Sequence, residues 1–131
     1  VMEKLNTCHR KHLRKICNIH YPGVISNKEL YRRCDTVPIT ERVRKARWTL
    51  LGHILRMDDS CPAVLSLRYA VESASSLKGR RGRPRTNLFS FIQADLKQHN
   101  IRLNCTEDLL NLRTIASERA KWRNMFSYDI G

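Results

Sequence analysis

The chain has 131 residues, with 25 Lys+Arg against 12 Asp+Glu and a formal net charge of +13. This length fits one domain or two small ones, and a hydrophobic content of 41% provides enough apolar material for a core, which argues against wholesale disorder. A pI near 10.2 predicts a polyanionic partner, either nucleic acid or an acidic surface.

No segment of the sequence has the composition of a membrane span or a signal peptide. The uninterrupted apolar stretches are a few residues long, far short of the ~20 residues that cross a bilayer. Five cysteines, an odd number, lie scattered along the chain, as expected of reduced thiols. We therefore expect a nuclear or cytoplasmic protein that is not secreted and has no membrane partner. The chain opens inside a helical pattern without a leader, so we also expect a fragment of a longer product.

The first two predicted helices occupy the N-terminal quarter of the chain. Apolar residues from Met2 to Cys17 recur at helical spacing, and Tyr21-Pro22-Gly23 is expected to end this helix. Ser26 and Glu29 have the spacing of a capping box, in which Ser26 caps the next helix and Glu29 reaches back. This second helix is short and is expected to end at about Cys34.

The third helix has the strongest pattern. Thr40 is its expected N-cap, and Asp58-Asp59-Ser60 is expected to end it. Pro62 suits the first turn of a fourth helix, which is expected to run to Ala74.

Two helical regions are expected in the last third of the chain. One starts at about Asn87, and Thr106 is expected to cap the other, which has a potential break near Ser117. In the former, four residues are expected to point inward: Leu88, Phe91, Ile92 and Leu96. No run of period-2 alternation is long enough for a strand.

These elements predict an all-α fold, a small helical bundle of five or six short helices with a basic flexible linker. We expect a basic helical bundle over residues 1–74, a Gly/Arg/Pro linker over 75–86 and a C-terminal helical pair over 87–131. Residues 1–85 carry 19 Lys+Arg and 7 Asp+Glu, a net charge of +12, and the remaining residues carry +1. A binding surface is therefore expected in the first two-thirds of the chain.

The linker contains the densest basic run, with five cations in eight residues: Lys78, Arg80, Arg81, Arg83 and Arg85. Glycines keep its backbone slim, and Pro84 favours an extended conformation at Arg83. Its core, Arg81-Gly82-Arg83-Pro84, resembles the AT-hook of high-mobility-group A proteins. Three interpretations stay open: nonspecific nucleic-acid contact, binding in the DNA minor groove, and a solvated basic linker.

Basic residues also follow the apolar stripes of two predicted helices. On the third helix these are Arg42, Arg44, Lys45, Arg47 and Arg56, and on the first they are Arg10, Lys11, Arg14 and Lys15. Such faces can follow phosphates, although charged helix faces are often only solvated. We expect Arg42, Arg44, Lys45, Arg14 and Lys15 to contact nucleic acid. Trp48 and Trp122 fall on apolar faces and are expected in the core.

No catalytic residue, metal site or cofactor is expected. The spacing of Cys8, His12, Cys17 and His20 permits tetrahedral zinc in principle but lacks the paired-cysteine signature. The adjacent carboxylates Asp58 and Asp59 have no third carboxylate nearby, so we interpret them as a solvated turn.

Five blocks, in order, carry a family resemblance: residues 13–19, 25–33, 42–57, 79–85 and 116–123. The third contains Trp-x-x-Leu-Gly-His-x-x-Arg-Met from Trp48 to Met57, and the fourth contains Gly-Arg-Pro-Arg. Together they resemble the segment downstream of the reverse transcriptase domain in non-LTR (LINE-type) retrotransposon polyproteins. Met57-Asp58-Asp59 is not the polymerase's own Asp-Asp motif, because it lacks the aromatic residue and follows a predicted helix.

The resemblance implies a nucleic-acid-binding C-terminal module of an RNA-directed DNA polymerase, with no catalysis in this chain itself. Its partners would be RNA or DNA and the upstream reverse transcriptase domain of the same polyprotein. Two alternatives stay open: a structural interaction domain packed on the parent polymerase, and an AT-hook minor-groove binder. Gly52 and His53, inside the third helix, are more simply explained by close packing than by ligand contact.

Overall fold

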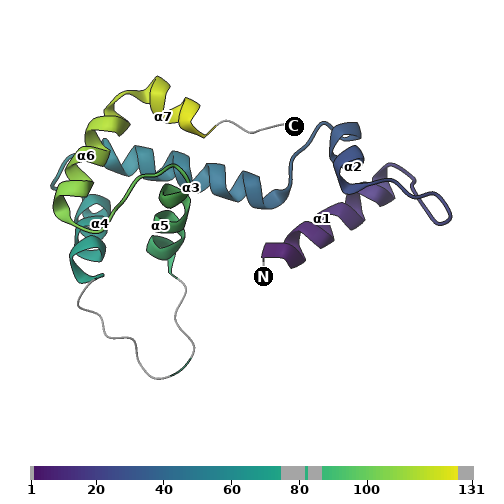
Figure 1. Cartoon of the computed structure of the whole chain (residues 1–131), viewed down its shortest axis with the longest axis horizontal. Coiled ribbons are helices and arrows are strands. Elements are labelled where there is room, and N and C mark those ends of the chain that lie inside the picture. The colour runs from purple at the N-terminus through teal and green to yellow at the C-terminus, as the bar shows by residue number, and fades with distance from the viewer. Residues whose placement is uncertain (1, 75–81, 83–86, 127–131) are drawn as a thin grey trace. The chain divides into compact units, whose positions relative to one another are not determined.

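A computed structural model describes residues 2–74, 82 and 87–126. Within these residues the protein has seven α-helices and no strand, which confirms the predicted all-α fold. The helices are α1 (Met2–Ile16), α2 (Asn27–Arg33), α3 (Ile39–Leu55), α4 (Pro62–Ser73), α5 (Leu88–Gln98), α6 (Thr106–Ser117) and α7 (Arg119–Met125) (Figure 1). The potential break near Ser117 is present, and it separates α6 from α7.

The described chain divides into two compact units, one of residues 2–46 and one of residues 47–126. The boundary falls inside α3, so that its first two turns belong to the first unit and the rest to the second. Helices from both sides of residues 75–86 pack together in the second unit, where α4 contacts α6. From the sequence, residues 1–74 are expected to form one bundle.

Local signals define several helix ends. Ser26 Oγ accepts a hydrogen bond from the Glu29 N–H, and Asn87 Oδ1 accepts one from the Ser90 N–H, so both act as N-caps. Pro62 begins α4, as expected. Thr40, by contrast, is not a cap, because α3 begins one residue earlier.

Three helices end in a Schellman motif without glycine. The residue after the C-cap has a left-handed backbone in each case: Asn18 (φ 53°) after α1, Asp35 (φ 45°) after α2 and Asn100 (φ 57°) after α5. Two backbone hydrogen bonds close each motif; after α1, Ile19 N–H donates to Arg14 O at 2.9 Å and Asn18 N–H to Lys15 O at 3.2 Å. Asn and Asp tolerate this backbone region better than other non-glycine residues.

The first unit joins α1, α2 and the start of α3 through few buried groups. Leu30 of α2 is its only buried apolar residue among the described ones. The buried Asn6 side chain links α1 to α3, since its Nδ2 donates to Thr40 Oγ1 at 3.1 Å and its Oδ1 accepts from the Thr40 N–H at 3.3 Å. The thiols of Cys17 and Cys34 also meet, with their Sγ atoms 3.4 Å apart.

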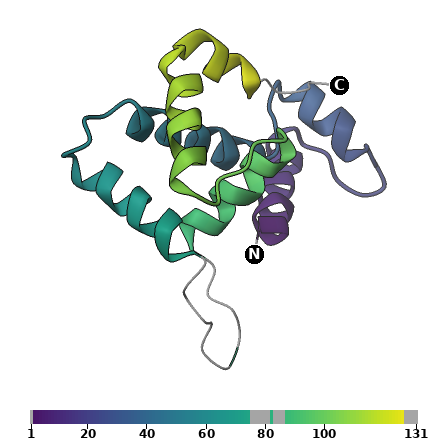
Figure 2. The ribbon, with the colours of Figure 1, turned by 60° about the vertical axis from the view of Figure 1, so that its left-hand side comes forward.

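The second unit has a larger core centred on two tryptophans. The indoles of Trp48 and Trp122 stack with ring centroids 4.3 Å apart, and both residues are buried, as predicted. Each indole N–H donates to the other residue's backbone carbonyl, at 2.9 Å from Trp48 and 3.1 Å from Trp122. This reciprocal pair ties α3 to α7, and α6 and α7 run at an angle to each other beside α3 (Figure 2).

Gly52 allows that close approach. A Cβ atom built at Gly52 would lie 2.7 Å from Cδ1 of the Trp122 indole, a distance that side chains essentially never show. The packing explanation for this glycine is therefore the one that the structure supports. A glycine inside a helix costs about 1 kcal/mol relative to alanine, and the stacked and hydrogen-bonded indole offsets that cost.

One expectation about α5 is wrong in part. Ile92 and Leu96 are buried as predicted, but Leu88 is half exposed and Phe91 is 37% exposed. Phe91 lies instead under a guanidinium, with Arg47 Cζ 5.1 Å from the ring centroid. Its ring therefore supports a cation at the surface rather than filling the core.

Candidate nucleic-acid interface

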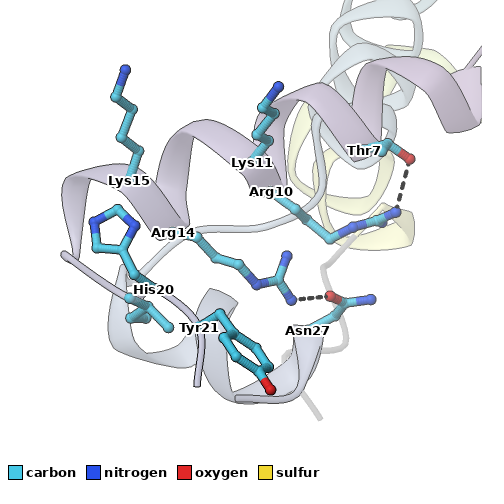
Figure 3. Close-up of a pocket in the computed structure, with 9 residues that line it drawn as sticks. Thr7, Arg10, Lys11, Arg14, Lys15, His20, Tyr21 and Asn27 are labelled. Atoms are coloured by element: carbon cyan, nitrogen blue, oxygen red, sulfur yellow. Dashed lines mark hydrogen bonds between the residues drawn. The ribbon is translucent and has the colours of Figure 1, made fainter. Parts of the chain in front are cut away.

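A basic groove lies within the first unit, between α1 and the segment that leads into α2 (Figure 3). Its volume is about 770 Å³. The residues that line it are Thr7, Arg10, Lys11, Arg14, Lys15, Ile19, His20, Tyr21 and Asn27. Four of them are Lys or Arg and none is Asp or Glu, so the groove has the charge of an anion-binding site.

Arg14 is held in this groove by neutral oxygen atoms. Its Nη2 donates to Asn27 Oδ1 at 2.7 Å and lies 3.5 Å from the backbone carbonyl oxygen of Ile25 (Figure 3). Neither acceptor carries a charge, so the guanidinium is fixed in position while its positive charge stays uncompensated by these contacts. Arginine has five N–H donors in a planar fork, and those not used here suit a phosphate.

Arg10 is also fixed, but by a carboxylate. Its Nη2 donates to Glu3 Oε1 at 2.9 Å and to Thr7 Oγ1 at 3.1 Å. The hydrogen bond from Arg10 lowers the pKa of the Glu3 carboxyl below its ordinary value, so this partner is ionised at neutral pH. Arg10 therefore shapes the groove while contributing less free charge than Arg14.

Lys11 and Lys15 provide free charge one helical turn apart. Figure 3 shows both side chains extending from α1 in the same direction. Within residues 2–74 and 87–126, no carboxylate pairs with either ammonium. The C-terminal end of the helix dipole favours Lys15, in the last turn of α1, but it does not reach Lys11. Like charges at this spacing repel by about 0.2–0.5 kcal/mol, which a bound anion would relieve.

A tight turn places an aromatic ring at the edge of the groove. The Gly23 N–H donates to the His20 carbonyl oxygen at 2.8 Å and closes the turn. Tyr21, inside that turn, is 94% exposed. A Cβ atom at Gly23 would lie 3.0 Å from the same His20 oxygen, so the turn is closely packed. The turn thus holds the backbone of Tyr21 while its ring stays in water.

The structure places the predicted binding residues of the first unit in two settings. Arg14 and Lys15 line the groove, whereas Arg42, Arg44 and Lys45 do not. Arg42 Nη2 donates to Thr36 Oγ1 at 2.8 Å, and Arg44 Nη1 pairs with Glu41 Oε1 at 3.2 Å. Lys45 lies on the exposed side of α3 and takes part in an interaction there. Of these five residues, Arg14 and Lys15 are therefore the two that line this groove.

Two further arginines of the predicted basic face have structural contacts in the second unit. Arg47 donates from Nε and Nη2 to Asp95 Oδ2 at 3.0 and 2.8 Å, with side chains only 15% and 8% exposed. Arg56 Nη1 donates to the Ala116 carbonyl oxygen at 3.0 Å. Both arginines bind partners far away in sequence, which explains why a helical pattern alone assigned them to a phosphate-facing surface.

The predicted residues of the basic run, Lys78, Arg80, Arg81, Arg83 and Arg85, lie outside the described residues. Gly82 alone is described there, with a φ of 127° that favours glycine. The AT-hook interpretation therefore stays a prediction.

Of the two adjacent aspartates after α3, Asp58 and Asp59, the second has a structural role. Asp59 Oδ1 accepts a hydrogen bond from Arg68 Nη2 at 3.1 Å and another from Arg113 Nη1. The bond from Arg113 lowers the pKa of the Asp59 carboxyl. Arg113 also donates to the carbonyl oxygens of Leu55 and Met57 at 3.0 and 2.8 Å, and so satisfies the end of α3.

The Cys and His residues of the N-terminal segment make separate small contacts, among them one of 3.6 Å between Cys8 Sγ and His12 Nδ1. Cys17 meets Cys34, and this hydrogen bond raises the pKa of the Cys34 thiol. His12 Nδ1 lies 2.8 Å from the Cys8 carbonyl oxygen, and His20 Nε2 lies 3.1 Å from Asn18 Oδ1. Within residues 2–74, 82 and 87–126, no group of three or more His, Cys, Asp or Glu is placed to hold a metal ion.

Five lining residues were not predicted to contact nucleic acid: Thr7, Ile19, His20, Tyr21 and Asn27. The sequence marked Tyr21-Pro22-Gly23 only as a helix stop. An aromatic residue within a Pro-Gly turn, next to a basic helix end, was the available signal.

In the described part of the chain, no helix is both long enough and apolar enough to cross a membrane. The chain matches no protein-family profile, no curated protein and no solved structure.

Proposed function

We propose that this chain is a nucleic-acid-binding module whose phosphate site is the basic groove of the first unit. The observation that carries the proposal is the state of Arg14: its position is fixed by neutral oxygens, and no carboxylate lines the groove around it. A preorganised guanidinium with uncompensated charge is well suited to bidentate contact with a phosphate.

Charged helix faces are often only solvated, and two features favour a binding role here. Lys11 and Lys15 repeat at a spacing where their charges repel, and neither has a carboxylate partner within the described residues. The lining also joins three segments of the chain around one hollow, whereas a solvated helix face requires no such convergence.

The sequence blocks extend this proposal to a biological setting. In this setting, the chain is the C-terminal module of a non-LTR retrotransposon reverse transcriptase and holds template RNA or target DNA for that polymerase. The groove and the Lys78–Arg85 run would then be two contact regions of one module. Catalysis would belong to the upstream domain.

The salt dependence of binding tests the groove. We compare the full chain with K11A/K15A, which removes two groove cations, and with K4A/K28A, which removes two exposed lysines of the same unit that do not line the groove. Each released counterion contributes about 0.7 to the slope of log K against log salt for a single strand. We therefore expect K11A/K15A to flatten the slope by about 1.4, and K4A/K28A to change it much less.

Equal effects of the two double variants would show that net charge, and not the groove, governs binding. A flat slope for the full chain would contradict nucleic-acid binding altogether. A separate variant, R80A/R81A/R83A/R85A, tests the basic run, for which we expect a further flattening by up to about 2.8. The interaction-domain alternative predicts a complex between this chain and a protein partner. A complex of that kind that persists at a salt concentration high enough to remove nucleic acid would favour this alternative.

A further inference from the structure

Tyr21 has an exposure that the fold does not explain. Its ring is 94% exposed, and it lines the same groove as Arg14 and Lys15. In Figure 3 the ring lies on the α2 side of the groove, toward the Arg14 guanidinium and Asn27, whereas the side chains of Lys11 and Lys15 extend from α1 away from the ring. An aromatic ring this exposed beside a basic groove is a candidate for contact with a ligand.

We propose that the groove takes a single-stranded nucleic acid, with phosphates on the α1 cations and one base stacked on Tyr21. This inference rests on the proposed function, because it assigns the class of nucleic acid to the same groove. Single-strand binders combine a basic groove along the backbone with aromatic rings on which bases stack. In Figure 3 the guanidinium group of Arg14 lies on the same side of α1 as the Tyr21 ring.

The turn that carries Tyr21 is suited to stacking because its backbone is already fixed. The hydrogen bond from Gly23 to His20 closes the turn, and His20 Nε2 lies within hydrogen-bond distance of Asn18 Oδ1. At this turn, binding therefore needs to order the ring of Tyr21, which has few rotatable bonds, and not the backbone. Less conformational entropy is lost than if a loop had to fold on the ligand.

The geometry favours an unpaired strand over a duplex. A base face becomes available for stacking only where the strand is unpaired, since a duplex buries its base faces and presents base edges in its grooves. The cations from Arg10 to Lys15 span about 7.5 Å along α1, which is room for about two phosphates of one strand. A short segment of one strand thus fits both the cation row and the ring.

The test compares Y21A, Y21F and Y69A in the full chain. Tyr69 is the matched control, because it is also an exposed tyrosine (69%) and lies on α4 of the second unit. The probes are oligothymidylate and oligouridylate of about 12 nucleotides, within the site sizes of single-strand binders, and a DNA hairpin duplex. Comparing the affinities for the two single strands shows whether the groove prefers DNA or RNA.

We expect Y21A to weaken single-strand binding by about 5- to 150-fold, the loss of one base–aromatic stack, with duplex binding unchanged. Y21F should bind as the wild type does, and so should Y69A. The fluorescence of a bound strand that carries 2-aminopurine should be quenched by stacking on the wild type and on Y69A. This quenching should be lost on Y21A.

The outcomes separate this inference from the proposed function. If K11A/K15A weakens binding and Y21A does not, the phosphate groove stands and the single-strand assignment is overturned. If Y21A lowers the affinity for the duplex and for the single strand equally, the proposed stacking of a base on Tyr21 is overturned. If neither variant has an effect, the groove itself is not the site and both proposals fail.

Discussion

The two units of this chain use their cations differently. In residues 2–46 there are 11 Lys+Arg against 4 Asp+Glu, whereas residues 47–74 and 87–126 contain 9 against 7. Several arginines of the second unit bind partners inside the fold, as Arg47 does with Asp95 and Arg113 with the end of α3. In the first unit, Arg14, Lys11 and Lys15 line a groove that has no carboxylate in its lining.

The cores differ in the same direction. The second unit buries a stacked tryptophan pair and a set of leucines and valines, whereas Leu30 is the one buried apolar residue described in the first. A thin core leaves more of a small unit's residues at the surface. The contrast agrees with the proposed function, in which the second unit would provide stability and the first the binding surface.

The largest effect on stability should come from the tryptophan pair. Replacing Trp122 by alanine removes the stacked ring and the hydrogen bond to the Trp48 carbonyl oxygen. Such a truncation in a core costs about 3–5 kcal/mol of the free energy of unfolding. Denaturation followed by the fluorescence of Trp48 measures it, with Y69A as an exposed control. A loss below about 1 kcal/mol would contradict the central role of this pair.

The next effect should come from the ion pair between α3 and α5. D95A leaves the guanidinium of Arg47 largely buried beside Phe91 without its carboxylate. Breaking a buried pair from one side costs about 3–5 kcal/mol, and exposure at this edge should bring the loss toward the lower value. The control is E118A, which breaks an exposed pair with Lys121 and should cost at most about 1 kcal/mol. If D95A and E118A lowered the free energy of unfolding in urea by the same amount, the distinction between structural and free cations would fail.

A smaller loss is expected from G52A. The added methyl group would overlap the Trp122 indole, and overpacking of this kind costs about 1–3 kcal/mol even though alanine favours a helix. T49A, at an exposed position of the same helix, should stay within about 0.5 kcal/mol of the wild type in the same thermal or urea melts. If G52A were more stable than the wild type, the close approach of α3 and α7 would be wrong.

The smallest effect concerns pH. The bond from Arg113 lowers the pKa of Asp59, so this carboxylate stabilises the fold above its unfolded pKa of about 3.9, and the contribution is lost as pH falls below that value. D59N should therefore be less stable than the wild type at neutral pH, and the difference should shrink in acid. NMR titration of the Asp59 carboxyl gives the direct measurement, and an unshifted pKa would contradict the contact.

Much of the helical layout was predictable because it is encoded locally. Ser26 and Asn87 cap their helices through side chains a few residues from the groups that they satisfy, and Pro62 fits a first turn. Helix ends at Asn18 and Asp35 were less visible, since the motif there uses Asn or Asp in place of glycine.

The site was predictable only in part because its contacts are tertiary. Arg14 and Lys15 stood out by charge, but nothing local shows that Asn27 fixes Arg14 or that Tyr21 faces the same groove. Likewise, Arg47 has the spacing of a phosphate-binding residue, and its partner lies 48 positions away. A charge pattern identifies candidate cations, and folding decides which of them stay free.

The most direct test of this division is an amide NMR titration of the full chain with a single-stranded oligonucleotide. We expect chemical-shift changes at groove residues of the first unit, with Arg14 Nε–H and the His20–Gly23 turn among the largest. Residues 47–74 and 87–126 should change little. Changes concentrated in those ranges, with the α1 groove unaffected, would contradict the assignment of binding to the first unit.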